Sequence, residues 1–247
     1  MFSDPHVLVL IAAALMAGTV GGFAGFGGAL VFMPLASALI EPRMAAAAFL
    51  VVSGVLTVPL FVSAVRLCRW YQILPTALAA MATAPLGAWI LAAADPLALR
   101  WAISALALAL LGLLMSGWRY RGEPPVAASL AVGGVSGLLG GISQVAGPPV
   151  IMFWMSGPNP PHVLRANFIV YFTVTGLSTF AAYLWNGFFS GAVAELILAV
   201  TPAYALALFV GARLFRLASA AFYRRLAFAA VAAAAITSMP VFDGMLR

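Results

Sequence analysis

The sequence contains no lysine, a single cysteine and six carboxylates, and only 7% of its 247 residues are charged. So little charge cannot cover the surface of a soluble domain, and uninterrupted apolar runs of membrane-spanning length recur from end to end. The single cysteine, Cys68, excludes an internal disulfide, and no neighbouring His or Cys could share a metal ion with it. The sequence therefore predicts an all-α integral membrane protein, with one transmembrane domain over residues 1–247.

The few carboxylates are peripheral. Each lies at a terminus or at the end of a predicted span: Asp4, Glu41, Asp95, Glu123, Glu195 and Asp243. No carboxylate pair is available for acid–base catalysis, and no acidic residue stands at mid-membrane to relay sodium ions or protons. The HExxH, GxSxG and GK[ST] motifs are also absent. These absences argue against an enzyme, a metal site and a bound cofactor, and they argue against cation transport.

What the sequence does contain is a glycine-rich stretch that occurs twice, at Gly18–Gly28 and at Gly133–Gly147. A shift of 119 residues superimposes them and keeps the register downstream, pairing Gly18 with Gly137, Gly22 with Gly141, Gly28 with Gly147, Pro42 with Pro161 and Phe49 with Phe168. Late in each half, an offset of 124 pairs Leu86-Gly87-Ala88 with Val210-Gly211-Ala212. The chain is therefore predicted to hold a repeat at 7–117, a link at 118–125 and a second repeat at 126–241.

Each predicted repeat begins with a long apolar stretch that glycines break, at residues 7–40 and 126–157. Both exceed the about 20 residues that one span needs, so each is either one tilted helix or two shorter helices. Three transmembrane helices follow in each half, and the predicted spans are 44–65, 73–94, 99–117, 163–185, 190–212 and 221–241.

The net charge of +6 comes from arginines in the short connections between spans. There they act as orientation signals, which argues against nucleic acid as a partner. If each glycine stretch crosses the membrane once, the arginines divide five against seven; if each is a hairpin, they divide nine against three. The second division is the asymmetry that the positive-inside rule expects. Hairpins would give the repeats inverted topology, with both termini outside, a recurrent transporter plan. The single crossing stays open.

The predicted interior offers anion chemistry. A helix that starts at the second glycine break would present backbone N–H groups and a partial positive charge to an anion, beside Ser143 and Gln144. The candidate substrate contacts at the two breaks are Gly25, Gly27, Gly28, Ser143, Gln144, Gly147 and Pro148. The alternative is that the glycines only pack helices and that Gln144 is a satisfied polar residue in a helix interface.

Further candidate contacts lie on the spans that follow the breaks. Asn167 and Tyr171 are four residues apart on one helical face, with Arg165 beside it. Arg165 is equally well explained as a boundary arginine whose head reaches the membrane surface. Ser53 and Thr57 could line the opposite wall, although such hydroxyls more often bond to the backbone of their own helix.

The run Gly21–Gly28 with Pro34, the triplet Gly147-Pro148-Pro149 and the run Arg165–Phe168 resemble the TauE/SafE, or sulfite exporter, family over nearly the whole chain. The resemblance implies a permease of the bacterial inner membrane for sulfite, thiosulfate or an organosulfonate, with these residues contributing to its site. The two glycine breaks of this chain are unequal: the first carries no strongly polar side chain, and the second supplies most of the side-chain donors.

The sequence therefore predicts a secondary permease that exports a small sulfur-containing anion and whose partners are this anion and the lipid bilayer. Export can run without a coupling carboxylate, because an inside-negative membrane drives anions outward. A channel-like facilitator and a non-transporting membrane scaffold remain alternatives, and monomer and homodimer are both open.

Overall fold

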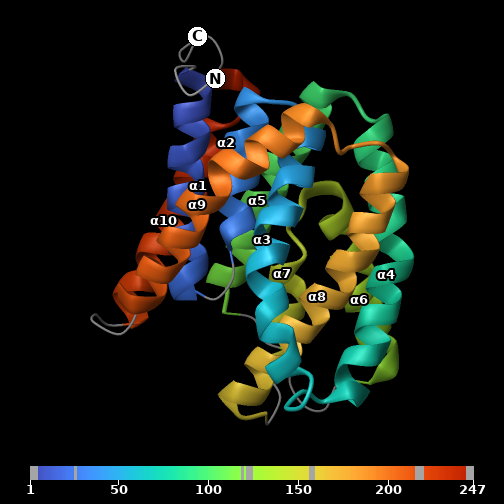
Figure 1. Ribbon diagram of the computed structural model, residues 1–247. Coiled ribbons are helices and arrows are strands. Elements are labelled where there is room, and N and C mark those ends of the chain that lie inside the picture. The colour runs from blue at the N-terminus through green and yellow to red at the C-terminus, as the bar shows by residue number, and fades with distance from the viewer. Residues whose placement is uncertain are drawn as a thin grey trace.

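The computed structural model describes residues 5–24, 27–117, 120, 125–155, 159–214 and 220–242 (Figure 1). These residues form helices and no strand: α1 (Pro5–Ala24), α2 (Gly28–Leu39), α3 (Pro42–Ala64), α4 (Trp70–Ala93), α5 (Pro96–Met115), α6 (Val126–Ser143), α7 (Gly147–Trp154), α8 (Pro161–Trp185), α9 (Gly191–Leu214), α10 (Ala220–Thr237) and a 3-10 turn at Pro240–Phe242. By length and composition, α4, α5, α6, α8 and α9 can each cross a membrane.

Each glycine-broken stretch is two helices, not one tilted helix. The first break separates α1 from α2, and Gly27 at its end adopts the left-handed φ of 92°. The second break separates α6 from α7, and Gln144 there has φ of 59°. A left-handed residue ends a helix because it turns the chain out of the helical path. In both cases the second helix packs against the first (Figure 1).

The most extensive helix contacts pair α1 with α9 and α6 with α4. In each pair three glycines at matching positions lie directly against backbone carbonyls of the other helix: Gly18 on Tyr204, Gly22 on Leu208 and Gly211 on Thr19 in the first pair, and Gly137 on Ala80, Gly141 on Ala84 and Gly87 on Leu138 in the second. In the second pair Gly133 lies in the same way on Thr76. The matched contacts follow the sequence offsets: α1 residues shifted by 119 give the α6 residues, and α4 residues shifted by 124 give the α9 residues. Each glycine-broken helix is thus packed against a helix of the opposite half.

Proline within α4 is accommodated by a side chain from another helix. Pro85 has no N–H, so the carbonyl of Met81 one turn earlier lacks its usual helical donor. The hydroxyl of Ser178 in α8 donates to that carbonyl at 3.2 Å. The bond compensates the interrupted helix and fixes α8 against α4.

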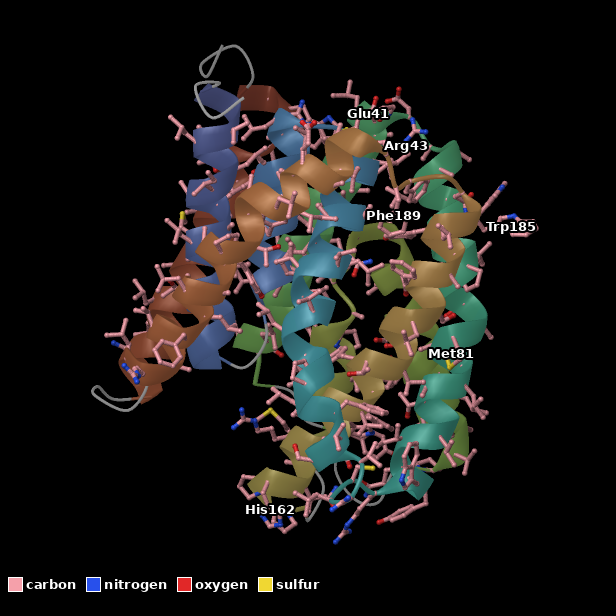
Figure 2. All side chains as sticks on the ribbon, viewed as in Figure 1. Glu41, Arg43, Met81, His162, Trp185 and Phe189 are labelled. Atoms are coloured by element: carbon pink, nitrogen blue, oxygen red, sulfur yellow. The ribbon has the colours of Figure 1, made fainter. Side chains whose placement is uncertain are left out.

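Helices α3 and α8 pack against each other, and the first half of α3 lies in the core. Ala45, Ala46, Ala47 and Ala48 of α3 are fully buried, so the helices around them approach closely. Figure 2 places Glu41 and Arg43 at one end of the bundle and His162 at the other. Figure 1 shows that α1 starts and α10 ends at the Glu41 end.

We expect Gly137→Ala to destabilise the fold, because a Cβ there would collide with the backbone of Ala80. Overpacking of this kind costs about 1–3 kcal/mol, so the Tm of the purified protein should fall. Gly112→Ala is the matched control, since Gly112 is an exposed glycine within α5 whose Cβ would meet no atom within 4 Å. Equal Tm values for the two variants would contradict the packing role of Gly137.

Candidate functional site

The second break is held by a hydrogen-bond network from α8. The side-chain amide of Gln144 donates to the carbonyl of Gly140 at 3.1 Å and to the hydroxyl of Tyr183 at 3.0 Å. That hydroxyl donates in turn to the carbonyl of Gly141 at 2.8 Å. Carbonyls at a helix end lack intrahelical donors, so Tyr183 satisfies the end of α6. The side-chain amide of Gln144, which the sequence predicts to contact substrate, therefore donates its hydrogen bonds to groups of the protein.

A second tyrosine of α8 holds the other side of the same break. The fully buried Tyr171 donates to the hydroxyl of Ser136 in α6 at 2.9 Å, and Ser136 donates to the carbonyl of Ala146 at 2.6 Å. Neither Ser136 nor Tyr183 is among the contacts that the sequence predicts. A usable signal existed for Tyr183, because it continues the spacing of four residues that begins at Tyr171.

Three of the predicted contacts bond to their own helices. Ser143 donates to the carbonyl of Leu139, at 2.9 Å, and is fully buried. Ser53 and Thr57 donate within α3, to the carbonyls of Phe49 and Ser53, at 2.7 Å and 2.8 Å. For Ser53 and Thr57 the structure thus shows the alternative in which each hydroxyl bonds to the backbone of its own helix.

Asn167 lies in a polar cluster at the His162 end of the bundle. Its side-chain oxygen accepts from the backbone N–H of Arg69 at 2.8 Å, and its amide donates to the side-chain oxygen of Gln72 at 3.1 Å. Asn159 donates to the same oxygen of Gln72 at 2.8 Å. The cluster joins α8 to the start of α4, whereas Arg165, the fifth residue of α8, is exposed. In the described part of the chain Arg165 makes no hydrogen bond to a residue of either helix break.

The start of α7 has fewer free donors than its position suggests. The helix begins at Gly147, and the next two residues, Pro148 and Pro149, have no N–H. Pro148 is buried. An anion at this helix end would therefore meet a depleted set of backbone donors.

The first break differs in this respect. Gly25 lies outside the described residues, but Gly27 caps α2 without a side-chain hydrogen bond, and none of the first three residues of α2 is proline. Gly28 is buried against Tyr204 of α9: a Cβ at Gly28 would lie 2.6 Å from the tyrosine hydroxyl. The backbone N–H groups of this turn therefore stay uncapped by any side chain of the described part of the chain.

Negative charge stays away from both breaks in the residues that the structure describes. Glu41, Asp95 and Glu195 are exposed at helix starts. Asp95 accepts from the N–H groups of Leu97 and Ala98, both at 3.0 Å, and so caps α5. The described interior thus holds uncharged donors and no carboxylate that would repel an anion.

We expect Tyr183→Phe to lower the free energy of unfolding by about 1–3 kcal/mol, because the buried carbonyl of Gly141 loses its side-chain donor. The check is thermal unfolding of the purified protein in detergent. Tyr71→Phe provides a comparison at an exposed position and should leave Tm nearly unchanged. A Tm for Tyr183→Phe as high as the control value would contradict the clamp at the second break.

Comparison with known proteins gives one family. A family model described as "Sulfite exporter TauE/SafE" matches residues 10–238. The match spans both glycine breaks and extends from α1 to the end of α10. No curated protein and no solved structure gives a significant match.

Proposed function

Because the chain belongs to the sulfite exporter TauE/SafE family, we propose that it is a secondary permease that exports a small sulfur-containing anion such as sulfite, thiosulfate or an organosulfonate across the bacterial inner membrane. Membership of this family and several apolar helices of spanning length make it a multi-pass membrane transporter. The observation that carries the proposal is the pair of helix breaks within a bundle whose described interior has no carboxylate.

We propose further that the two halves are inverted repeats. The matched glycine contacts of α1 with α9 and of α6 with α4 support this relation. In Figure 1 the α1–α2 pair opens toward the end where α1 starts, and the α6–α7 pair opens toward the opposite end. Irregular backbone at membrane depth is tolerated where it is buried or lines a cavity. Two such breaks that enter from opposite faces provide a transport route between them.

The proposed contacts along this route are those of the two breaks and of the helices beside them. They are Gly25, Gly27, Gly28, Ser53, Thr57, Ser143, Gln144, Gly147, Pro148, Arg165, Asn167 and Tyr171. Arg165 would act at the mouth of the route, where it is exposed. The outward direction follows from the membrane potential, which favours anion exit by about 2.3 kcal/mol per charge per 100 mV.

Flux in proteoliposomes tests this function. Sulfite efflux should accelerate when the vesicle interior is made negative, and Gln144→Ala and Arg165→Ala should each slow it about tenfold or more, since bonds to charged groups contribute about 1.5–3 kcal/mol. Glu195→Gln, at an exposed position of α9, is the control and should transport normally. Unchanged flux in both variants would contradict the two contacts.

Stepwise single-channel currents would favour a channel, and stable copurifying partners without flux would favour a scaffold.

Topology can be read from the single cysteine. Cys68, in the link between α3 and α4, should react with a membrane-impermeant maleimide from the cytoplasmic side, because Arg66 and Arg69 flank it. Burial raises the pKa of the Cys68 thiol, so less thiolate is present at neutral pH and labelling should accelerate as pH rises. Inside-out and right-side-out vesicles provide the measurement.

A cysteine at the other end is the reciprocal control. Glu41 lies at the opposite end of the bundle from His162 (Figure 2), so Cys68→Ser combined with Glu41→Cys should label from the outside only. Labelling of Cys68 and of Glu41→Cys from the same side would rule out this placement of α3 across the membrane.

A further inference from the structure

Beside the first break lies a largely buried tyrosine that is not one of the contacts proposed above. Tyr204 of α9 is only 6% exposed, and within the described residues its hydroxyl makes no hydrogen bond. This distinguishes it from Tyr171 and Tyr183, whose hydroxyls are both bonded at the second break. The oxygen of this hydroxyl is not itself fully buried, so a ligand or a water molecule can reach it and supply the hydrogen-bond partner that the protein does not.

Packing fixes the direction of this hydroxyl. A Cβ on Gly28 would lie 2.6 Å from it and a Cβ on Gly21 3.3 Å from it, so the hydroxyl reaches between α1 and α2 where only glycine leaves room. The ring is held by an edge-on contact with Phe49, with ring centroids 5.6 Å apart. Tyr204 is therefore rigidly placed beside the first residue of α2.

The first turn of α2 supplies the complementary donors. Gly28, Ala29 and Leu30 are its first three residues, each has a backbone N–H, and no side chain caps them. N–H groups in the first turn of a helix lack intrahelical acceptors and carry partial positive charge. In the second repeat the positions equivalent to Ala29 and Leu30 are Pro148 and Pro149, which have no N–H to offer.

We infer that the first turn of α2 and the hydroxyl of Tyr204 together form the subsite that binds the oxygens of the transported sulfur oxyanion. The inference rests on the proposed function and specifies where the anion is held. Converging N–H and O–H donors match a head group that presents several oxygens, as sulfite and sulfonates do. At the second break Tyr183 bonds to Gln144 and Tyr171 bonds to Ser136, so the anion is held first at the first break and reaches the contacts proposed at the second break later along the route.

Two variants test the subsite independently. Tyr204→Phe removes the hydroxyl and keeps the ring that packs on Phe49. Ala29→Pro removes one N–H from the first turn, where proline is tolerated, and gives α2 the residue that stands at the equivalent place in α7. Each variant should raise the half-saturating sulfite concentration for efflux about tenfold, the effect expected when one hydrogen bond to a charged group is lost. Tyr120→Phe, which removes a hydroxyl from a tyrosine paired with Phe153, is the control and should keep the wild-type value.

Ligand-induced stabilisation gives a second readout that does not depend on flux. Sulfite should raise the Tm of the wild-type protein and of Tyr120→Phe, and it should raise that of Tyr204→Phe and Ala29→Pro much less. Acetate at the same concentration should leave Tm unchanged, and an equal shift by acetate would overturn the assignment to a sulfur oxyanion. If Tyr204→Phe does not fold, Ala29→Pro alone decides.

The outcomes separate the subsite from the function. Wild-type protein that neither transports nor is stabilised by any sulfur anion overturns the proposed function. Wild-type protein that transports sulfite, while Tyr204→Phe and Ala29→Pro keep its half-saturating concentration and its Tm shift, overturns the subsite and leaves the function standing.

Discussion

The rest of the structure depends on glycines that bring helix backbones into contact. Lipid tails are as apolar as the helices themselves, so association within a membrane relies on close packing and not on the removal of apolar surface from water. Seven glycines provide that packing between α1 and α9 and between α4 and α6. These contacts hold each broken helix against the opposite half, and they thereby fix where both breaks lie.

The two breaks each join two helices that pack together, and their chemistry differs. At the second break, Tyr171 and Tyr183 hold Ser136 and Gln144, and prolines remove N–H groups from the start of α7. At the first break, glycines leave the backbone donors of α2 uncapped. Interior polar groups that are mutually satisfied rigidify a structure, whereas groups without partners are suited to a ligand.

Much of the helix arrangement could be predicted from composition and spacing. Each of the six predicted spans corresponds to a helix, and four of these helices, α4, α5, α8 and α9, are long and apolar enough to cross a membrane. Both predicted breaks separate two helices, and the offsets of 119 and 124 relate glycine contacts of the structure, because length and glycine position act locally. The candidate site was less accessible to sequence reasoning. The roles of Ser53 and Asn167 depend on their hydrogen-bond partners, and those of Asn167 lie nearly a hundred residues away in the chain.

By itself the sequence determined a membrane-embedded chain with an interior poor in carboxylates and predicted two related halves, because apolar content, repetition and the positions of charged residues can be read without coordinates. Only the tertiary structure decided which polar side chains bind each other and which stay available. Tyr204 illustrates the difference: in the sequence it is one aromatic residue within an apolar span. Its importance arises because α9 packs on α1 and places its hydroxyl beside Gly28, and that contact joins residues far apart in the chain.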